Sequence, residues 1–234
     1  MINWIAFDAD DTLWHNEKLW LDGRDKYHEI LAKYQLEPGI DEILDKTEIY
    51  NIRYYGYGVM SFALSLIEVA IRVTDGRLTA ADTNAILNLG KDMLTAKLPP
   101  ADSVHETLNA LSASHPLMVI TKGDLFHQRR KVNEAGLRDY FQAVEVVCKK
   151  NTQTYTEIFE RYRIEPEQFL MVGNSLRSDI KPILELGGWA VHILNDLRWA
   201  HDEAEIPAEL HSRYVEVKQL EDVREAIKEL GIAS

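Results

Sequence analysis

The stretch MINWIAFDADDTLW, residues 1–14, decides how the rest of the chain is interpreted. Its largely apolar run at 2–7 is too short for a helix and stops at Asp8, so it predicts a buried β-strand. Three carboxylates and a hydroxyl follow at once, from Asp8, Asp10, Asp11 and Thr12. Because acidic side chains occupy the place where a secretion signal carries its apolar segment, no signal peptide is expected.

Short apolar runs recur in the second half of the chain and alternate with helical patterns. The runs lie at 117–120, 143–147, 169–172, 189–193 and 214–217. Helical periodicity follows them at 124–135, 152–162, 176–186 and 220–230. This alternation predicts parallel strands with helices on both faces. Since crossover connections are right-handed, the expected fold class is α/β, with a doubly wound parallel sheet of the Rossmann-like type.

No strand is predicted between about residue 14 and about residue 98. Helical periodicity covers 18–36, 40–52, 59–73 and 80–96, with turn signals between these segments. The simplest interpretation is a helical domain at 15–98, inserted into an α/β core made of 1–14 and 99–234.

Composition excludes several classes of function. The 234 residues include 26 Lys and Arg against 38 Asp and Glu, a formal net charge of −12. Such an acidic chain is a poor partner for nucleic acid and for anionic membrane surfaces. Its one cysteine, Cys148, excludes an internal disulfide and a cysteine-rich zinc site. No apolar stretch reaches the length of a membrane span, so we expect a soluble, cytoplasmic protein whose oligomeric state is not predicted.

Polar residues follow four of the predicted strands, where a doubly wound sheet binds its ligands. They are Asp8 and Asp10, then Thr121, Lys122 and Gly123, then Lys149 and Lys150, and finally Asn174 and Asp179. Carboxylate and amide oxygens suit Mg²⁺ rather than zinc, and a lysine would balance their charge. A hydroxyl and free backbone amides before a helix make an anion site. The combination predicts phosphoryl transfer, for which an aspartate is a competent nucleophile.

The same residues resemble a known family. The run at 7–13 is similar to the first motif of the haloacid dehalogenase superfamily, in its Asp-x-Asp-x-Thr phosphatase form. The run at 119–124 resembles the second motif, Lys150 the lysine of the third, and 172–179 the fourth. The helical insertion resembles the cap called C1. The dehalogenases themselves lack the second aspartate, so Asp10 favours a phosphatase.

The resemblance implies catalytic roles for Thr121, which also binds substrate, and for three further side chains. Asp8 would be the nucleophile, which is phosphorylated and then hydrolysed. Asp10 would be the general acid for the leaving group and then the base for water. Lys150 would orient Asp8 and offset charge.

The resemblance also implies binding roles. Thr121, with the backbone amides of Lys122 and Gly123, would hold the transferring phosphoryl group. Mg²⁺ would be bound by Asp8, the backbone carbonyl of Asp10, Asn174 and Asp179. Within the cap, the tyrosine-rich stretch at 50–58 suggests that Tyr54 and Tyr57 contact substrate, although packing within the cap explains them equally well.

Two departures from the family pattern stand out. Asn174 occupies a position that is usually aspartate, which removes one negative charge from the metal site. Lys149 and Lys150 are adjacent, and Lys150 is preferred because it starts the following helical pattern. On the helix after the second motif, His127, Arg129, Arg130 and Lys131 are interpreted as a solvated basic face.

The expected function is a Mg²⁺-dependent phosphomonoester hydrolase that acts on a small phosphorylated metabolite through an aspartyl-phosphate. A phosphomutase of the same superfamily, or a ligand-binding member weakened by Asn174, is the alternative. A receiver-type phospho-acceptor fits poorly, because receiver domains are shorter and carry no helical insertion.

Overall fold

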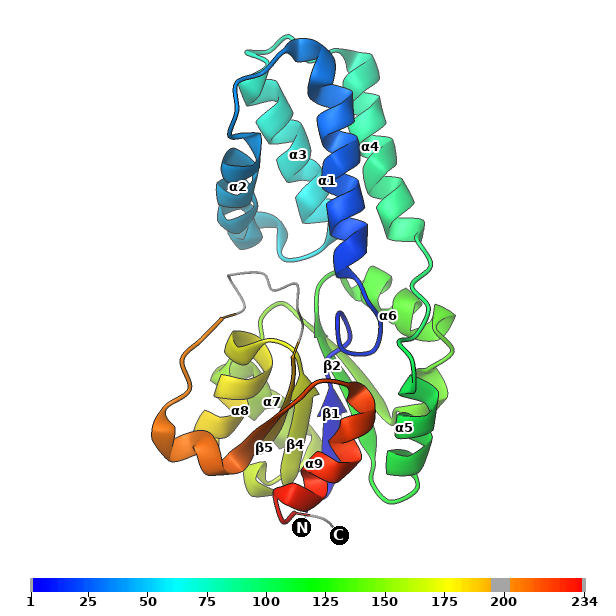
Figure 1. The fold of residues 1–234 in the computed structure, drawn as a ribbon, viewed down its shortest axis with the longest axis vertical. Helices are drawn as coiled ribbons and strands as arrows, with labels where there is room; N and C mark the ends of the chain where they lie inside the picture. Colours follow the sequence, from blue (N-terminus) through cyan, green and yellow to red (C-terminus); the bar gives the residue numbers. More distant parts are fainter. Residues whose placement is uncertain (1, 195–202, 233–234) are drawn as a thin grey trace. The chain divides into compact units, whose positions relative to one another are not determined.

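The computed structural model describes residues 2–194 and 203–232 (Figure 1). The chain divides into two compact units. One, here the core unit, contains residues 1–15 and 98–234, and the other, the helical unit, contains residues 16–97. No helix in the described part of the chain is both long and apolar enough to cross a membrane.

The core unit is built on a six-stranded parallel sheet with the order β3-β2-β1-β4-β5-β6. The strands are β1 (Trp4–Phe7), β2 (Leu117–Lys122), β3 (Ala143–Val147), β4 (Phe169–Gly173), β5 (Trp189–Ile193) and β6 (Tyr214–Val217). From β1 the chain winds outward through β2 and β3, then returns to β4 on the other side of β1. The order of strands therefore reverses at β1, which places a ligand crevice beyond the carboxyl ends of β1 and its neighbours.

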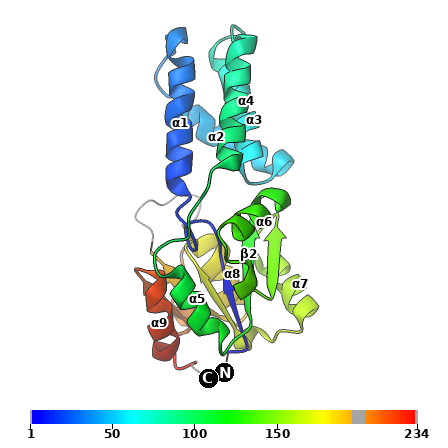
Figure 2. The same cartoon turned by 90° about the vertical axis from the view of Figure 1, so that its right-hand side faces the viewer.

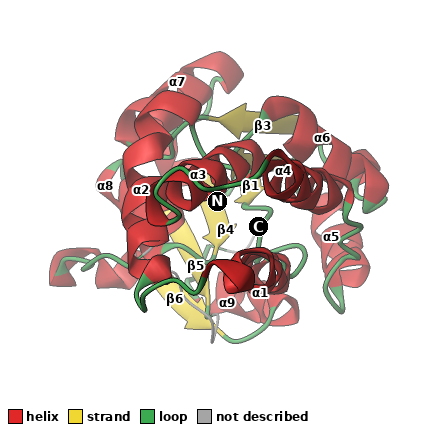
Figure 3. Ribbon diagram, turned by 90° about the horizontal axis from the view of Figure 1, so that it is seen from above, coloured by secondary structure: helices red, strands yellow, loops and turns green. Residues whose placement is uncertain are grey.

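Both faces of the sheet are covered by helices, as Figure 3 shows. Alternate residues of one strand enter different clusters: Ile5 and Phe7 pack with α5 (Val104–Ser112), α6 (Leu125–Glu134) and α9 (Val223–Glu229). Ala6 packs on the opposite face with α7 (Thr152–Tyr162) and α8 (Lys181–Glu185). This two-residue alternation explains why the strands appear in the sequence as continuous apolar runs. The predicted doubly wound parallel sheet is confirmed.

The helical unit contains α1 (Glu17–Leu31), α2 (Ile40–Tyr55), α3 (Val59–Val73) and α4 (Ala80–Thr95). Figure 2 shows α1 and α4 running side by side. The apolar faces of the helices in this unit form a core separate from that of the core unit. It contains Tyr27 of α1 and Phe62 and Leu66 of α3, which are nearly inaccessible to solvent. Glycine allows one close approach, since a Cβ at Gly90 would lie 2.9 Å from the Cβ of Ala63 on α3.

The segment predicted as one helix at 176–186 begins as a π-helical turn, Leu176–Ile180, and continues as α8. Pro182 has no N–H, so it cannot donate to the carbonyl of Ser178 one turn earlier. That carbonyl instead accepts a hydrogen bond from the Tyr155 hydroxyl of α7 at 3.0 Å. Proline thus explains both the irregular turn and the buried tyrosine that satisfies it.

Candidate active site

The first predicted site residue, Asp8, lies directly after β1 and contacts a buried lysine. The ammonium group of Lys150 donates to Asp8 Oδ1 and lies 2.6 Å from Asp179 Oδ1. Lys150 is positioned by the start of α7, where the side chain of Asn151 caps the helix by accepting from the Thr154 amide. The adjacent Lys149 is exposed. Of the two lysines, Lys150 is therefore the one that reaches the predicted nucleophile.

Burial and charge have opposite effects on the pKa values of Asp8 and Lys150, which together with Asp179 form a buried trio. Burial raises the pKa of Asp8 above its ordinary value; Lys150 opposes the shift and Asp179 adds to it. Burial alone would lower the pKa of Lys150, but the two carboxylates outweigh it and raise that pKa. Lys150 therefore remains a cation between two acidic groups, which would otherwise repel one another.

Asp179 is fixed by backbone groups as well as by Lys150. It lies in the π-helical turn after β4, and its Oδ2 accepts from the backbone amide of Ser175 at 3.0 Å. A Cβ at Gly173 would lie 2.5 Å from Asp179 Cγ. Glycine is therefore needed at the end of β4 so that this carboxylate can approach the strand.

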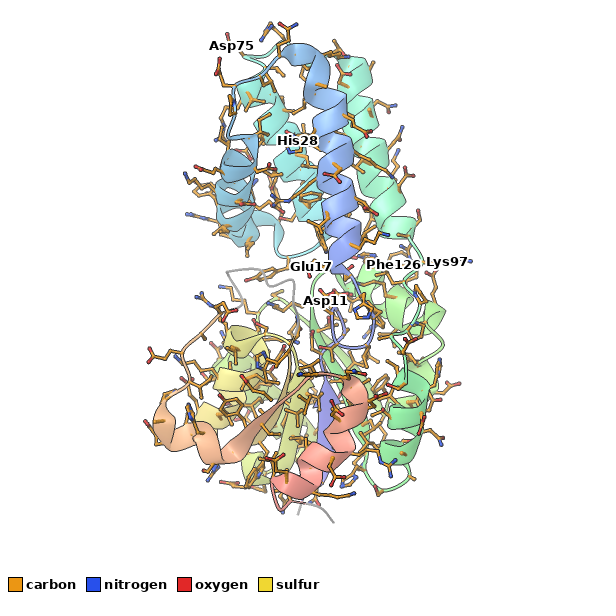
Figure 4. All side chains as sticks on the ribbon, in the orientation of Figure 1. Asp11, Glu17, His28, Asp75, Lys97 and Phe126 are labelled. Atoms are coloured by element: carbon orange, nitrogen blue, oxygen red, sulfur yellow. The ribbon has the colours of Figure 1, made fainter. Side chains whose placement is uncertain are left out.

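The carboxylate of Asp10 is held by three donors. Trp14 Nε1 donates to Oδ1 at 2.7 Å, Gln128 Nε2 to Oδ2 at 2.9 Å, and Lys131 Nζ to Oδ1 at 2.5 Å. Burial favours a raised pKa, but the charge of Lys131 and these hydrogen bonds outweigh it, so the pKa of Asp10 is lowered. Asp10 itself stands in the loop after β1 that also contains Asp11 (Figure 4).

The predicted solvated basic face of α6 is only partly correct. Arg129 is exposed as expected, whereas His127 and Lys131 are buried. Burial, followed by the charge of Lys131, lowers the pKa of His127 to about 4. Sequence reasoning missed Gln128 and Lys131 as neighbours of Asp10. Their spacing of three residues puts them on one face of α6, but the sequence does not show that this face is turned inward.

The predicted phosphate-binding loop follows β2. Thr121 is buried at the end of the strand, and Gly123 adopts a positive φ of 137° just before α6. The Asp124 side chain caps α6 by accepting from the His127 amide at 2.8 Å. In this structure the Thr121 hydroxyl donates to the Lys122 carbonyl at 3.4 Å, and the Gly123 amide donates to the Val147 carbonyl at 3.4 Å. Both contacts are long, and they lie at a helix N-terminus, a position where proteins bind anions. Lys122 directs its ammonium group to Ser178 Oγ, 2.9 Å away.

Asn174, the departure from the family pattern, begins the loop after β4. Thr12 Oγ1 lies 3.5 Å from Asn174 Oδ1, a long contact between two of the family-like motifs. Below the loop, His192 Nε2 lies 3.1 Å from the Asn174 carbonyl, and His192 Nδ1 lies 3.2 Å from Glu216. His192, on β5, thus contacts the backbone of this loop.

The donor set can be compared with the needs of a metal ion. Within residues 2–194 and 203–232 there is no cluster of three His, Cys, Asp or Glu side chains arranged around a metal position. The available donors are the carboxylates of Asp8 and Asp179, the amide oxygen of Asn174 and the backbone carbonyl of Asp10. All are hard oxygens, which fit Mg²⁺ and do not fit zinc.

The two predicted residues of the insertion lie in the helical unit. Tyr54, on α2, is 62 % exposed, and Tyr57 stands half-buried in the turn between α2 and α3. The hydroxyls of Tyr50 and Tyr54 lie 3.2 Å apart, and the Arg53 guanidinium stacks 3.8 Å from the Tyr50 ring centroid. These contacts explain the aromatic stretch locally, and substrate contact by Tyr54 and Tyr57 stays a prediction.

Comparisons with known proteins show which family this sequence resembles. A profile of haloacid dehalogenase-like hydrolases matches residues 2–187. Glyceraldehyde 3-phosphate phosphatase of Methanopyrus kandleri is 27% identical over 205 residues, covering 82% of this chain and 84% of that protein. N-acylneuraminate-9-phosphatase of Mus musculus is 25% identical over 197 residues, covering 78% of each protein.

One solved structure is similar over almost the whole chain. It is a haloacid dehalogenase-like family hydrolase from Xanthomonas campestris, with a TM-score of 0.86 and 34% identity, covering 98% of this chain and 91% of that one. Together with the profile match over most of the sequence, this similarity shows that the chain belongs to the haloacid dehalogenase-like hydrolase family.

Proposed function

We propose that this protein is a Mg²⁺-dependent phosphomonoester hydrolase that acts on a small phosphorylated metabolite through an aspartyl-phosphate on Asp8. The observation that carries the proposal is the contact of Asp8 with Lys150, which also binds Asp179, at the reversal point of the sheet. Family members named for phosphatase activity support the reaction class.

In the first step, an oxygen of Asp8 attacks the phosphorus atom and the bond to the leaving oxygen breaks. Lys150 binds Asp8 on one side and Asp179 on the other, which fixes the orientation of the Asp8 carboxylate. Thr121 and the amides of Lys122 and Gly123 bind the phosphoryl oxygens, whose charge they stabilise. Asp10 first takes up a proton from solvent and then gives it to the leaving oxygen, which departs as an alcohol.

In the second step, water attacks the phosphorus atom of the aspartyl-phosphate. Asp10, now a carboxylate, takes a proton from that water, and the bond between phosphorus and Asp8 breaks. Inorganic phosphate leaves, and the carboxylate of Asp8 is restored. A bound Mg²⁺, held by Asp8, Asn174, Asp179 and the backbone carbonyl of Asp10, would supply positive charge next to the phosphoryl group.

The substrate class follows from the binding groups of the core unit. A hydroxyl, backbone amides and a helix N-terminus recognise a terminal phosphate and no other part of a metabolite. The relatives named above act, by their names, on a phosphorylated triose and a phosphorylated acyl sugar acid. Small phosphorylated carbohydrates are therefore the first compounds to try.

Phosphate release from 4-nitrophenyl phosphate and from a panel of sugar and triose phosphates tests the proposal, with Mg²⁺ and with EDTA. We expect release that depends on Mg²⁺, and a trapped protein that carries one extra phosphoryl group after a rapid acid quench. Asp8→Asn should abolish both signals while the circular dichroism spectrum stays unchanged. Asp139→Asn, an exposed aspartate of the core unit, is the matched control.

Release that persists in Asp8→Asn would contradict the role of Asp8. Release unaffected by EDTA would contradict the metal requirement. Isomerised product without free phosphate would favour a phosphomutase instead.

A further inference from the structure

We propose that Lys131 and Gln128 of α6 are positioning residues, which hold the carboxylate of Asp10 in the orientation that its acid and base role requires. This inference rests on the proposed function and adds two residues to it. Neither side chain belongs to the four motifs recognised in the sequence.

The contacts of Asp10 occupy its oxygens unequally. Oδ1 accepts from Trp14 Nε1 and from Lys131 Nζ, whereas Oδ2 accepts from Gln128 Nε2. A carboxylate oxygen accepts about two hydrogen bonds. Among the contacts of the described residues, Oδ1 is therefore saturated and Oδ2 keeps one free lone pair. The geometry assigns Oδ2 as the atom that carries the proton to the leaving group and later takes one from water.

The orientation of the Gln128 amide is fixed by chemistry. Its Nε2 donates to Asp10 Oδ2 at 2.9 Å and to the backbone carbonyl of Lys122 at 2.6 Å. The carbonyl accepts only, as does Asp10 in its carboxylate form, so a rotated amide would place Oε1 against two acceptors. The same side chain lies against Gly123, where a Cβ would be 2.9 Å from Nε2. Gln128 therefore links the loop of Asp10 to the loop that would hold the phosphoryl group.

The burial of these two polar side chains is not explained by packing alone. Lys131 is 6 % exposed and Gln128 is 4 % exposed. Gln128 Oε1 is buried and accepts no hydrogen bond within the described part of the chain. An apolar residue would avoid both the unsatisfied acceptor and the desolvated ammonium group. Their presence is explained if the site needs N–H donors aimed at Asp10.

The test compares leaving groups. A general acid matters most when the leaving oxygen is a strong base, as in an alkyl phosphate, and least for 4-nitrophenyl phosphate. We measure kcat/KM for both esters and for phenyl phosphates between them. In Lys131→Met we expect a loss of about 100-fold for the alkyl ester and under about tenfold for 4-nitrophenyl phosphate. Lys131→Arg, which keeps a charged donor, should recover part of the loss on the alkyl ester.

Arg129→Met is the matched control, because it removes the same charge from an exposed position of the same helix. It should change all esters equally and by a small factor. Gln128→Met, of similar length but without donors, gives a second test should Lys131→Met fail to fold. It should show the same selective loss on the alkyl ester.

A combined variant tests whether Lys131 acts through Asp10. In an Asp10→Asn background, adding Lys131→Met should change kcat/KM for 4-nitrophenyl phosphate by less than about twofold. A uniform loss on every ester, or losses that multiply in the combined variant, would overturn the positioning role. If the wild-type protein hydrolyses none of these esters, the proposed function itself fails; a wild-type turnover with uniform losses rejects only this inference.

Discussion

Replacing Lys150 with Met removes a cation that serves two buried carboxylates. The side chain of Lys150 is 1% exposed, and those of Asp8 and Asp179 are 10% and 1% exposed. Met keeps nearly the same length and fills the same volume, so packing should change little. The expected effect is therefore electrostatic: two acidic groups remain in a poorly solvated place without their shared partner.

The magnitude follows from that geometry. Removing one partner of a buried ion pair costs about 3–5 kcal/mol, because the remaining charge stays desolvated. Asp179 keeps its hydrogen bond from the Ser175 amide, which places the expected loss in the free energy of unfolding near the middle of that range, about 4 kcal/mol. Adding Asp8→Asn should recover part of the loss, since it removes one of the two uncompensated charges.

Urea denaturation in the presence of EDTA measures this loss, because no bound cation can then replace the ammonium group. Lys149→Met is the matched control: the neighbouring lysine is exposed, and its removal should change stability by less than about 0.5 kcal/mol. A loss below about 1 kcal/mol in Lys150→Met, or no recovery in the combined variant, would refute the reasoning.

Two further predictions concern the helical unit. Burial raises the pKa of Glu48 to about 7 although Arg24, 2.6 Å away, opposes the shift, so the folded state binds a proton more tightly than the unfolded state. The contribution of Glu48 to stability is present below about pH 4.5 and is lost as the pH rises through 7. The difference in the free energy of unfolding between wild type and Glu48→Gln should therefore shift by on the order of 2 kcal/mol between pH 5 and 8. A difference that stays constant over this range would contradict the prediction. Gly90→Ala should destabilise the protein by about 1–2 kcal/mol, because the contact with Ala63 outweighs a helix-propensity gain of about 1 kcal/mol. Thermal unfolding measures the change, and adding Ala63→Gly should lessen the clash. A Gly90→Ala protein more stable than wild type would show that α3 and α4 move apart enough to accommodate the added methyl group.

The strands could be predicted closely because both faces of the sheet are covered. β3, β5 and β6 begin and end at the predicted residues, and β2 and β4 extend slightly further into the polar loops. Such strands carry their own signal, a short apolar run that stops at a turn. Helix α5 was not predicted, although Val104, Leu108 and Leu111 repeat with helical spacing and are buried in the structure.

The first turns of the helical segments at 176–186 and 220–230 were harder to predict in detail. In the first, Pro182 gives a π-helical turn, and in the second a 3-10 turn, Leu220–Asp222, precedes α9. Both segments keep the helical spacing of their apolar residues, so periodicity could not distinguish them from regular helices. Which hydrogen bonds form depends on partners elsewhere, such as the Tyr155 hydroxyl.

The neighbours of Asp8 could be expected from topology, because parallel strands bring their carboxyl ends to one edge. The neighbours of Asp10 could not. Gln128 and Lys131 lie 118 and 121 residues away along the chain, within a helix whose charged residues would ordinarily face water. Gln128 and Lys131 become buried donors to Asp10 only because α6 lies beside the loop after β1, which the sequence alone does not show.

The pairing of lysines with aspartates has a consequence for how a divalent cation and a phosphate affect each other's binding. Lys131 pairs with Asp10, and Lys150 pairs with both Asp8 and Asp179. Lys122 contacts the hydroxyl of Ser178, the residue before Asp179. The formal charges of these three lysines and three aspartates cancel in a chain whose net charge is −12. Binding of a divalent cation alone would give this group of charges a net positive charge, and binding of a phosphate dianion alone would give it a net negative charge. Both together restore neutrality. We therefore expect each ligand to strengthen the binding of the other by the same factor, as thermodynamic linkage requires.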